Sequence, residues 1–133
     1  MKANLQQLVE IGSGKYIGYN QDAKNNFHYL ARHVARQIAK KLGLEKGSYD
    51  IRTNMGGIAV CGETTLHGEN IYIQISQSCL GPNMGFMYRS CQGRLDYTGG
   101  PNQWMKWDEL ANLDAACRKF ESVMYEAKDF SHR

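Results

Sequence analysis

The chain has 133 residues, of which 42% are hydrophobic, and a formal net charge of +3. A chain of this length can bury one hydrophobic core, so we expect a single domain over residues 1–133. The mildly basic charge suits a small anionic ligand better than duplex DNA, and we expect no DNA partner.

The four cysteines have neither CxxC spacing nor a second Cys or His pair at zinc-ligand spacing. We therefore expect free thiols, no bound metal and no cofactor. The first residues lack an apolar signal segment, and no apolar run approaches the roughly 20 residues that span a bilayer. These features predict a cytoplasmic protein that does not bind a membrane. The cysteines are Cys61, Cys79, Cys91 and Cys117.

Two segments near the N-terminus differ in how regularly their apolar residues are spaced. Residues 1–20 begin with a short apolar set at helical spacing and continue with a glycine-rich sequence, so we expect one turn of helix and then an extended arm. From Asp22 to Leu42 the apolar residues recur every three or four positions, which predicts an amphipathic helix. Asp22 is the expected N-cap and Gly43 the expected residue after the C-terminal end. The basic residues of this helix are expected on a solvated face.

Four β-like segments follow, and short turn-forming sequences separate them. Connections this short allow antiparallel neighbours but no parallel crossover, so the expected sheet is a meander. In the third segment Ile71, Ile73 and Ile75 alternate with polar residues, which is typical of a sheet with one face packed against helices. His67 falls in an expected hairpin turn. The segments are Tyr49–Asn54, Ile58–Thr65, Asn70–Gln77 and Phe86–Cys91.

A second amphipathic helix is expected from Trp107 onward, with its apolar stripe running to Met124, and the polar residues 129–133 form a tail that is expected to fray. The predicted fold is therefore α+β: a four-stranded antiparallel meander sheet flanked by an N-terminal and a C-terminal amphipathic helix, in the order αββββα. The two amphipathic helices and an arm with Tyr16 and Tyr19 exceed what one such sheet can cover, which predicts an oligomer.

The segment 86–102 is rich in groups that bind nucleotides. Its aromatic rings can stack on a base, its arginines can bind phosphate, and its smaller polar side chains can bind base or ribose edges. Its glycines also let backbone N–H groups approach an anion. The simpler alternative is an edge strand followed by a Gly-Gly-Pro turn. We select six candidate ligand-binding residues: Phe86, Arg89, Arg94, Asp96, Thr98 and Asn102.

Catalytic residues are not recognisable in the sequence. A hydrolase needs an activated nucleophile, an acid–base pair or a metal cluster, and none stands at a familiar spacing, so we expect no enzyme activity. The aromatic residues on the expected strands leave a second interpretation, an RNA- or single-strand-binding module. A small nucleotide-processing enzyme is the third.

Four sequence stretches resemble the phage Thoeris anti-defence sponges of the first described type. They are Gly-Lys-Tyr-Ile-Gly-Tyr (14–19), Asn-Met-Gly-Gly-Ile-Ala-Val (54–60), Ile-Ser-Gln-Ser-Cys (75–79) and Tyr-Arg-Ser-Cys-Gln-Gly-Arg-Leu-Asp-Tyr-Thr-Gly-Gly (88–100). The resemblance covers most of the chain.

The resemblance implies a phage anti-defence protein without enzyme activity that acts in the host bacterial cytoplasm. Such a protein sequesters a cyclic ADP-ribose-type immune signal, glycocyclic ADP-ribose, and thereby keeps the Thoeris effector inactive. It also implies homodimers with ligand pockets between protomers, and in some members homohexamers with further sites for cyclic oligonucleotides. Arg118 on the second helix is a weaker candidate that an interface between protomers can bring to the ligand.

Overall fold

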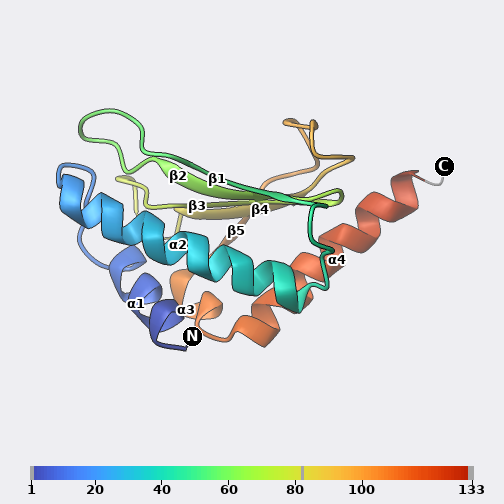
Figure 1. The fold of residues 1–133 in the computed structure, drawn as a ribbon, viewed down its shortest axis with the longest axis horizontal. Helices are drawn as coiled ribbons and strands as arrows, with labels where there is room; N and C mark the ends of the chain where they lie inside the picture. The colour runs from blue at the N-terminus through green and yellow to red at the C-terminus, as the bar shows by residue number, and fades with distance from the viewer. Residues whose placement is uncertain (1, 82, 132–133) are drawn as a thin grey trace.

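The computed structural model of the chain describes residues 2–81 and 83–131, with side chains described for 4–81 and 83–125. All of its helices lie on one side of the sheet, and the loop after β4 rises from the other side (Figure 1). None of the helices in the described ranges is both long enough and apolar enough to cross a membrane. The elements are α1 (Lys2–Gly12), α2 (Gln21–Lys41), β1 (Asp50–Asn54), β2 (Glu63–His67), β3 (Ile71–Ser76), β4 (Phe86–Ser90), β5 (Gln103–Met105), α3 (Trp107–Leu110) and α4 (Leu113–Ser131).

The sheet is an antiparallel meander with the strand order β1-β2-β3-β4-β5. The predicted α+β class, with an antiparallel sheet and helices at both ends, is confirmed. The predicted number of strands is wrong, because β5 pairs with β4 and places Met105 opposite Phe86. β5 has only three residues, which are too few for a period-two pattern to be recognised.

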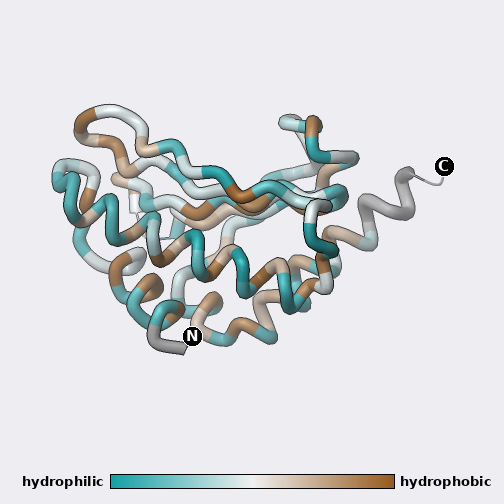
Figure 2. Tube along the Cα trace, in the orientation of Figure 1, coloured by the Kyte–Doolittle hydropathy of each residue, from teal (hydrophilic) through white to brown (hydrophobic). Residues whose placement is uncertain are grey.

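Alternation along the strands separates a helix-facing side of the sheet from an outer side. Ile71, Ile73 and Ile75 are fully buried, while the residues between them are half-buried, as the sequence predicts. α2 packs against β1 and β2, and α4 packs against β3 and β4. In Figure 2 hydrophobic residues recur along α2 with hydrophilic residues between them, which is the pattern of a helix with one buried face.

The helix predicted from Asp22 to Leu42 is confirmed as α2, but its N-cap differs from the predicted one. The Oδ1 atom of Asn20 accepts a hydrogen bond from the backbone N–H of Ala23 at 3.0 Å, so Asn20 and not Asp22 caps α2. Asp22 lies in the first turn, where its negative charge favours the positive end of the helix dipole. Gly43 follows the helix with a φ of 71°, as expected for a left-handed position.

Residues 1–20 are more ordered than the expected turn and arm. α1 has 11 residues, and its Leu8 is fully buried in the core. A Cβ atom on Gly12 would lie only 2.2 Å from the ring of Trp107, so glycine permits this close packing of α1 on α3. The segment after α1 is fastened by Gln77, whose Oε1 accepts from Ile17 N–H at 2.8 Å and whose Nε2 donates to Lys15 O at 2.9 Å.

The second strand begins five residues later than predicted. Residues 55–62 form a loop because Gly56, Ala59 and Gly62 have φ values of 68°, 70° and 77°, which a strand does not accommodate. The buried Lys24 holds this loop, since its Nζ donates to the carbonyls of Gly57 and Val60 at 3.1 and 3.0 Å. His67 is the last residue of β2 and is buried, so its expected position in a turn is also wrong.

The C-terminal helix is divided into α3 and α4. The side chain of Asn112 accepts a hydrogen bond from Ala115 N–H at 3.2 Å, which gives α4 a new N-terminal cap where one continuous helix was expected. α4 extends to Ser131 and so includes the start of the predicted frayed tail. His132 and Arg133, the remainder of that tail, lie outside the described residues.

Candidate functional site

A cavity of about 460 Å³ lies on the outer side of the sheet, over β1 and β2. Because β1 pairs with β2, the residues that line the cavity stand opposite one another, with Asp50 opposite His67 and Asn54 opposite Glu63. The volume falls within the range of roughly 300–1,000 Å³ that is common for small-ligand sites. The polar side chains that β1 and β2 contribute include Asp50, Arg52, Asn54, Glu63, Thr65 and His67.

Aromatic rings surround one end of the cavity. The His67 ring lies 5.1 Å from the ring of Tyr72 on β3 and 5.3 Å from the ring of Tyr97 in the loop after β4, both edge to face. Tyr97 is 58% exposed, so part of its ring is open to a ligand. These rings therefore offer surfaces against which the base or a ribose ring of a nucleotide can pack.

The loop 91–102 is shaped by its own carboxylate. Asp96 accepts hydrogen bonds from the backbone N–H groups of Gly99, Gln92 and Thr98, at 3.0, 2.9 and 3.0 Å, and from the Thr98 hydroxyl at 2.9 Å. These donors, led by Gly99 N–H, hold the pKa of Asp96 far below its ordinary value of 3.8. Asp96 and Thr98 thus build the loop, and their polar atoms are already paired.

Arg89 supports the same loop from β4. Its Nη2 donates to Tyr97 O at 2.7 Å and its Nη1 to Asn102 Oδ1 at 3.3 Å, while its guanidinium carbon lies 4.5 Å from the centre of the Tyr72 ring. A Cβ atom on Gly99 would lie 2.4 Å from Ser90 O and 3.0 Å from the Arg89 side chain, so the loop crosses β4 closely. Arg89 therefore positions Tyr97 beside the cavity.

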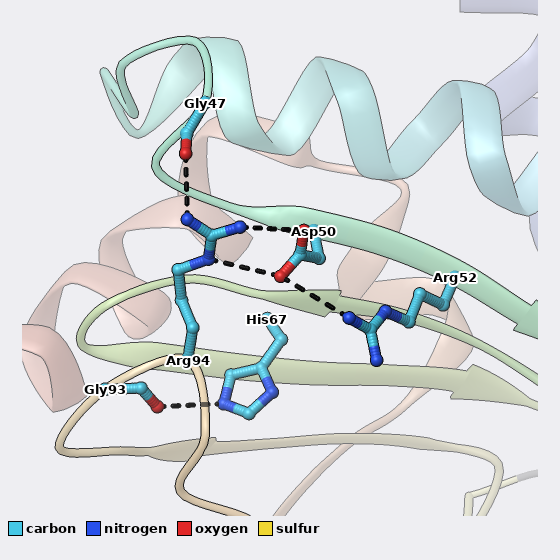
Figure 3. Close-up of polar contacts among 6 residues, drawn as sticks. All are labelled: Gly47, Asp50, Arg52, His67, Gly93 and Arg94. Atoms are coloured by element: carbon cyan, nitrogen blue, oxygen red, sulfur yellow. Dashed lines mark hydrogen bonds and ion pairs between the residues drawn. The ribbon is translucent and has the colours of Figure 1, made fainter.

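Arg94 attaches the far side of the loop to β1. Its Nη2 and Nε donate to the two carboxylate oxygens of Asp50 at 2.8 and 3.1 Å, and its Nη1 donates to Gly47 O at 2.9 Å (Figure 3). This ion pair lowers the pKa of Asp50 and raises that of Arg94. Arg52 approaches the same carboxylate at 3.9 Å, but 69% of its side chain is exposed.

The tautomer of His67 follows from its partner. Nε2 lies 3.0 Å from Gly93 O, which can only accept, so Nε2 carries the hydrogen. In the neutral ring Nδ1 is then an acceptor, and Figure 3 shows it turned away from Gly93. His67 thereby both fixes the loop and offers one acceptor beside the cavity.

The selection of Phe86 as a ligand-binding residue is wrong. It is fully buried on the helix side of the sheet, where its ring lies 6.0 Å from that of Phe120 and 5.8 Å from that of Trp107. A ring in this position has no face exposed to a ligand, so Phe86 belongs to the core. Alternation along β4 is the reason, because Phe86 and Tyr88 point to the helices and Arg89 to the outer side.

The other candidates are distributed unevenly. Arg89, Arg94, Asp96, Thr98 and Asn102 come together in or under the loop after β4, and Arg94 also lines the cavity. Arg118 is exposed on α4, in the layer of helices on the opposite side of the sheet.

Residues on β1 to β3 line most of the cavity and were not selected from the sequence. The alternation of side chains along a strand was a usable signal, since it already assigned Tyr72 to the face opposite the isoleucines. The same rule places Arg52 and Asn54 on one face of β1, and Glu63 and His67 on one face of β2.

Buried thiols near the site are poor nucleophiles. The Cys91 thiol donates to Gly68 O at 3.3 Å, and burial raises the pKa of Cys91, which opposes the thiolate that catalysis requires. On the helix side of the sheet, away from the cavity, burial likewise raises the pKa of Cys117 to about 11. Among the residues with described side chains, no three His, Cys, Asp or Glu groups lie close enough to hold a metal ion.

A larger cavity, of about 1,060 Å³, lies between α1, α2 and the turn from α3 to α4. Leu5, Val9 and Leu113 form its apolar walls, and Lys41 is ion-paired with Asp114 at its rim. Its described lining includes no aromatic ring, so it lacks a stacking surface for a base. The outer face of the sheet has the better chemistry for a nucleotide despite its smaller volume.

Comparisons of this chain with models of protein families, with curated proteins and with solved structures find no match.

Proposed function

We propose that the chain binds a cyclic ADP-ribose-type nucleotide in the cavity on the outer face of the sheet and holds it without converting it. The observation that carries the proposal is the meeting of an exposed tyrosine ring, Tyr97, with two arginines, Arg52 and Arg94, around a cavity of about 460 Å³. The resemblance to the anti-Thoeris sponges supports the same ligand class. In this function the protein removes an immune signal in the host cytoplasm during phage infection.

Arg52 is the main phosphate-binding residue in this proposal. Its guanidinium is largely exposed, and its contact with Asp50 at 3.9 Å is long for a hydrogen-bonded ion pair. Arg94 already uses Nε, Nη1 and Nη2 within the protein, so it contributes mainly positive charge and its remaining N–H groups.

The expected contacts are strong enough for sequestration. Stacking of one base contributes roughly 1–3 kcal/mol, and each hydrogen bond to a charged group roughly 1.5–3 kcal/mol. Several such contacts approach the roughly −12 kcal/mol of a nanomolar complex. A protein that competes with a receptor for a signal needs affinity of this order.

We further propose that two or more copies complete the site, as homodimers or homohexamers. In one protomer the cavity is open to solvent on the outer face of the sheet, and a second chain over that face would exclude water and strengthen the charged contacts. Cyclic oligonucleotides are a second ligand class that the resemblance suggests for such an assembly.

Calorimetric titration with cyclic ADP-ribose and glycocyclic ADP-ribose tests the proposed function. Arg52→Ala should weaken binding of the preferred nucleotide by on the order of 1.5–3 kcal/mol, because it removes a charged donor from the phosphate. Arg36→Ala is the matched control, since Arg36 is exposed on α2, on the helix side of the sheet. Equal affinities of the two variants for every nucleotide would contradict this site.

Trp104 supports a second candidate function, binding of single-stranded nucleic acid. It is 47% exposed on β5. The residues paired with it across the sheet, strand by strand, are Met87, Gln74, Thr65 and Arg52. Such a row of ring, polar and basic groups suits a stacked strand. Strand binding should weaken steeply with salt and should depend on Trp104, whereas binding of one small nucleotide in the cavity should not.

A further inference from the structure

A carboxylate and a carboxamide face each other at the end of the cavity that is remote from the loop. Glu63 is the first residue of β2 and Asn54 the last residue of β1, and the two are direct partners in the antiparallel pair. Both line the cavity. Directly opposed side chains have Cβ atoms roughly 4.5–5.5 Å apart, so the two groups can contact neighbouring atoms of one ligand.

The hydrogen-bonding roles of the two groups are complementary. Asn54 Oδ1 accepts from Gly56 N–H at 3.0 Å, which leaves the amide NH₂ of Asn54 as the donor toward the cavity. An ionised Glu63 is an acceptor only. Together they present one acceptor beside one donor.

Charge along the cavity fixes the direction of a bound nucleotide. Arg94 lies at the Asp50 end and Arg52 two residues nearer to Glu63, whereas Glu63 adds negative charge at the far end. A carboxylate repels a diphosphate, so the phosphates belong toward the arginines and the base toward Glu63.

We propose that Glu63 and Asn54 select the base of the bound nucleotide, and that they prefer adenine to hypoxanthine. This inference rests on the proposed function. The 6-amino group of adenine donates to Glu63 while N7 accepts from Asn54. Hypoxanthine has an oxygen at position 6, and along this edge it presents two acceptors, one of which meets the carboxylate. A site that binds one hydrogen-bonding pattern rejects the analogue that leaves a buried polar group unpaired.

The test compares cyclic ADP-ribose with cyclic inosine diphosphate ribose, which differ in the group at position 6, by calorimetry. We expect the wild-type chain to bind the adenine compound at least about tenfold more tightly. Glu63→Gln should reduce this preference severalfold or reverse it, because the glutamine amide can turn its NH₂ toward the oxygen. Glu45→Gln, in the turn after α2, is the matched control and should keep the wild-type ratio.

Asn54→Asp gives a second readout. Aspartate retains an acceptor for Gly56 N–H but has no NH₂ group, so this variant should bind both nucleotides more weakly. Circular dichroism before titration identifies the folded variants. The wild-type ratio and Glu63→Gln test the preference for adenine, and Asn54→Asp tests the contact with N7.

The outcomes separate the two proposals. If the wild-type chain binds neither of these compounds nor glycocyclic ADP-ribose, the proposed function fails and the base-reading role fails with it. If the wild-type chain binds both equally, or if Glu63→Gln leaves the ratio unchanged, only the base-reading role is overturned.

Discussion

Arg94 forms a two-point ion pair with Asp50, with N···O distances of 2.8 and 3.1 Å, although 44 positions separate the two residues in the sequence. Through this pair the loop that follows β4 is attached to β1, across the outer face of the sheet (Figure 3). Because Arg94 and Tyr97 both line the cavity, the ion pair also determines where the aromatic wall of the site stands.

Removal of this attachment should loosen the loop. We expect Arg94→Ala to speed hydrogen exchange at the loop amides from Gly93 to Gly100 and to weaken nucleotide binding. Asp50→Asn should add little once Arg94 is absent, because the two residues act as one unit. Exchange measured by mass spectrometry on the single and double variants gives this comparison.

The Lys41–Asp114 pair on the helix side is the control for that experiment. Lys41→Ala should leave exchange in the loop unchanged. Strictly additive effects of Arg94→Ala and Asp50→Asn on loop exchange would show that the pair does not hold the loop.

Tyr97 should contribute to affinity through its ring. We expect Tyr97→Ala to weaken nucleotide binding by roughly 1–3 kcal/mol, because one aromatic face that packs against the nucleotide is lost, whereas Tyr97→Phe should retain most of the affinity. Tyr19→Ala is a suitable control, since Tyr19 is also exposed but lies in the segment between α1 and α2. The stacking role would be refuted by equal losses in Tyr97→Ala and Tyr97→Phe.

Much of the fold was predictable because its signals are local. The apolar spacing of α2 and the alternation of Ile71, Ile73 and Ile75 each reflect the geometry of one element. The same alternation could have excluded Phe86 from the ligand site, since Phe86 and Tyr88 share a face of β4 and β4 pairs in register with the buried isoleucines of β3.

The remaining features depend on contacts between distant residues. β5 is a strand because Met105 pairs with Phe86, and three residues carry no periodic signal of their own. The segment after α1 is ordered because Gln77 bonds to it across 60 positions. The cavity likewise arises from strand register and from the pairing of Arg94 with Asp50, so the sequence identified the loop but not the sheet face beneath it.

Phe86 should matter for stability and not for ligand contact. We expect Phe86→Ala to reduce the free energy of unfolding by about 3–5 kcal/mol, because it removes a buried ring and leaves a cavity. Phe86→Leu keeps more of the apolar volume and should cost less. Urea denaturation measures both, and a folded Phe86→Leu variant should bind nucleotide like the wild-type chain. A large loss of affinity in a stable Phe86→Leu variant would show that Phe86 contributes to ligand binding.

His28 should make stability depend on pH. Its Nε2 donates to Cys61 O at 2.8 Å, and in the neutral ring its Nδ1 accepts from the Thr64 hydroxyl at 2.9 Å. Burial lowers the pKa of His28 below 6.5, and the nearby Arg32 and Lys24 act in the same direction. The unfolded chain therefore binds the proton more readily, and the stabilisation present above pH 6.5 should be lost as the pH falls through the folded-state pKa.

His28→Gln tests this linkage, because a glutamine amide can donate to Cys61 O and accept from Thr64 without titrating. Thermal unfolding between about pH 8 and pH 5 should show a smaller decrease for the variant than for the wild-type chain. His33→Gln, on the same helix, is the control. Identical pH profiles for the His28→Gln and wild-type chains would contradict a role for His28.

The central claim, that the chain binds the signal and does not convert it, is tested most directly by recovery of the ligand. Glycocyclic ADP-ribose is mixed with excess protein until a downstream sensor no longer responds, the protein is denatured by heat, and the supernatant is returned to the sensor and to mass spectrometry. The account predicts full recovery of activity with an unchanged mass. A signal that stays inactive, or that has gained the mass of one water molecule, would contradict it.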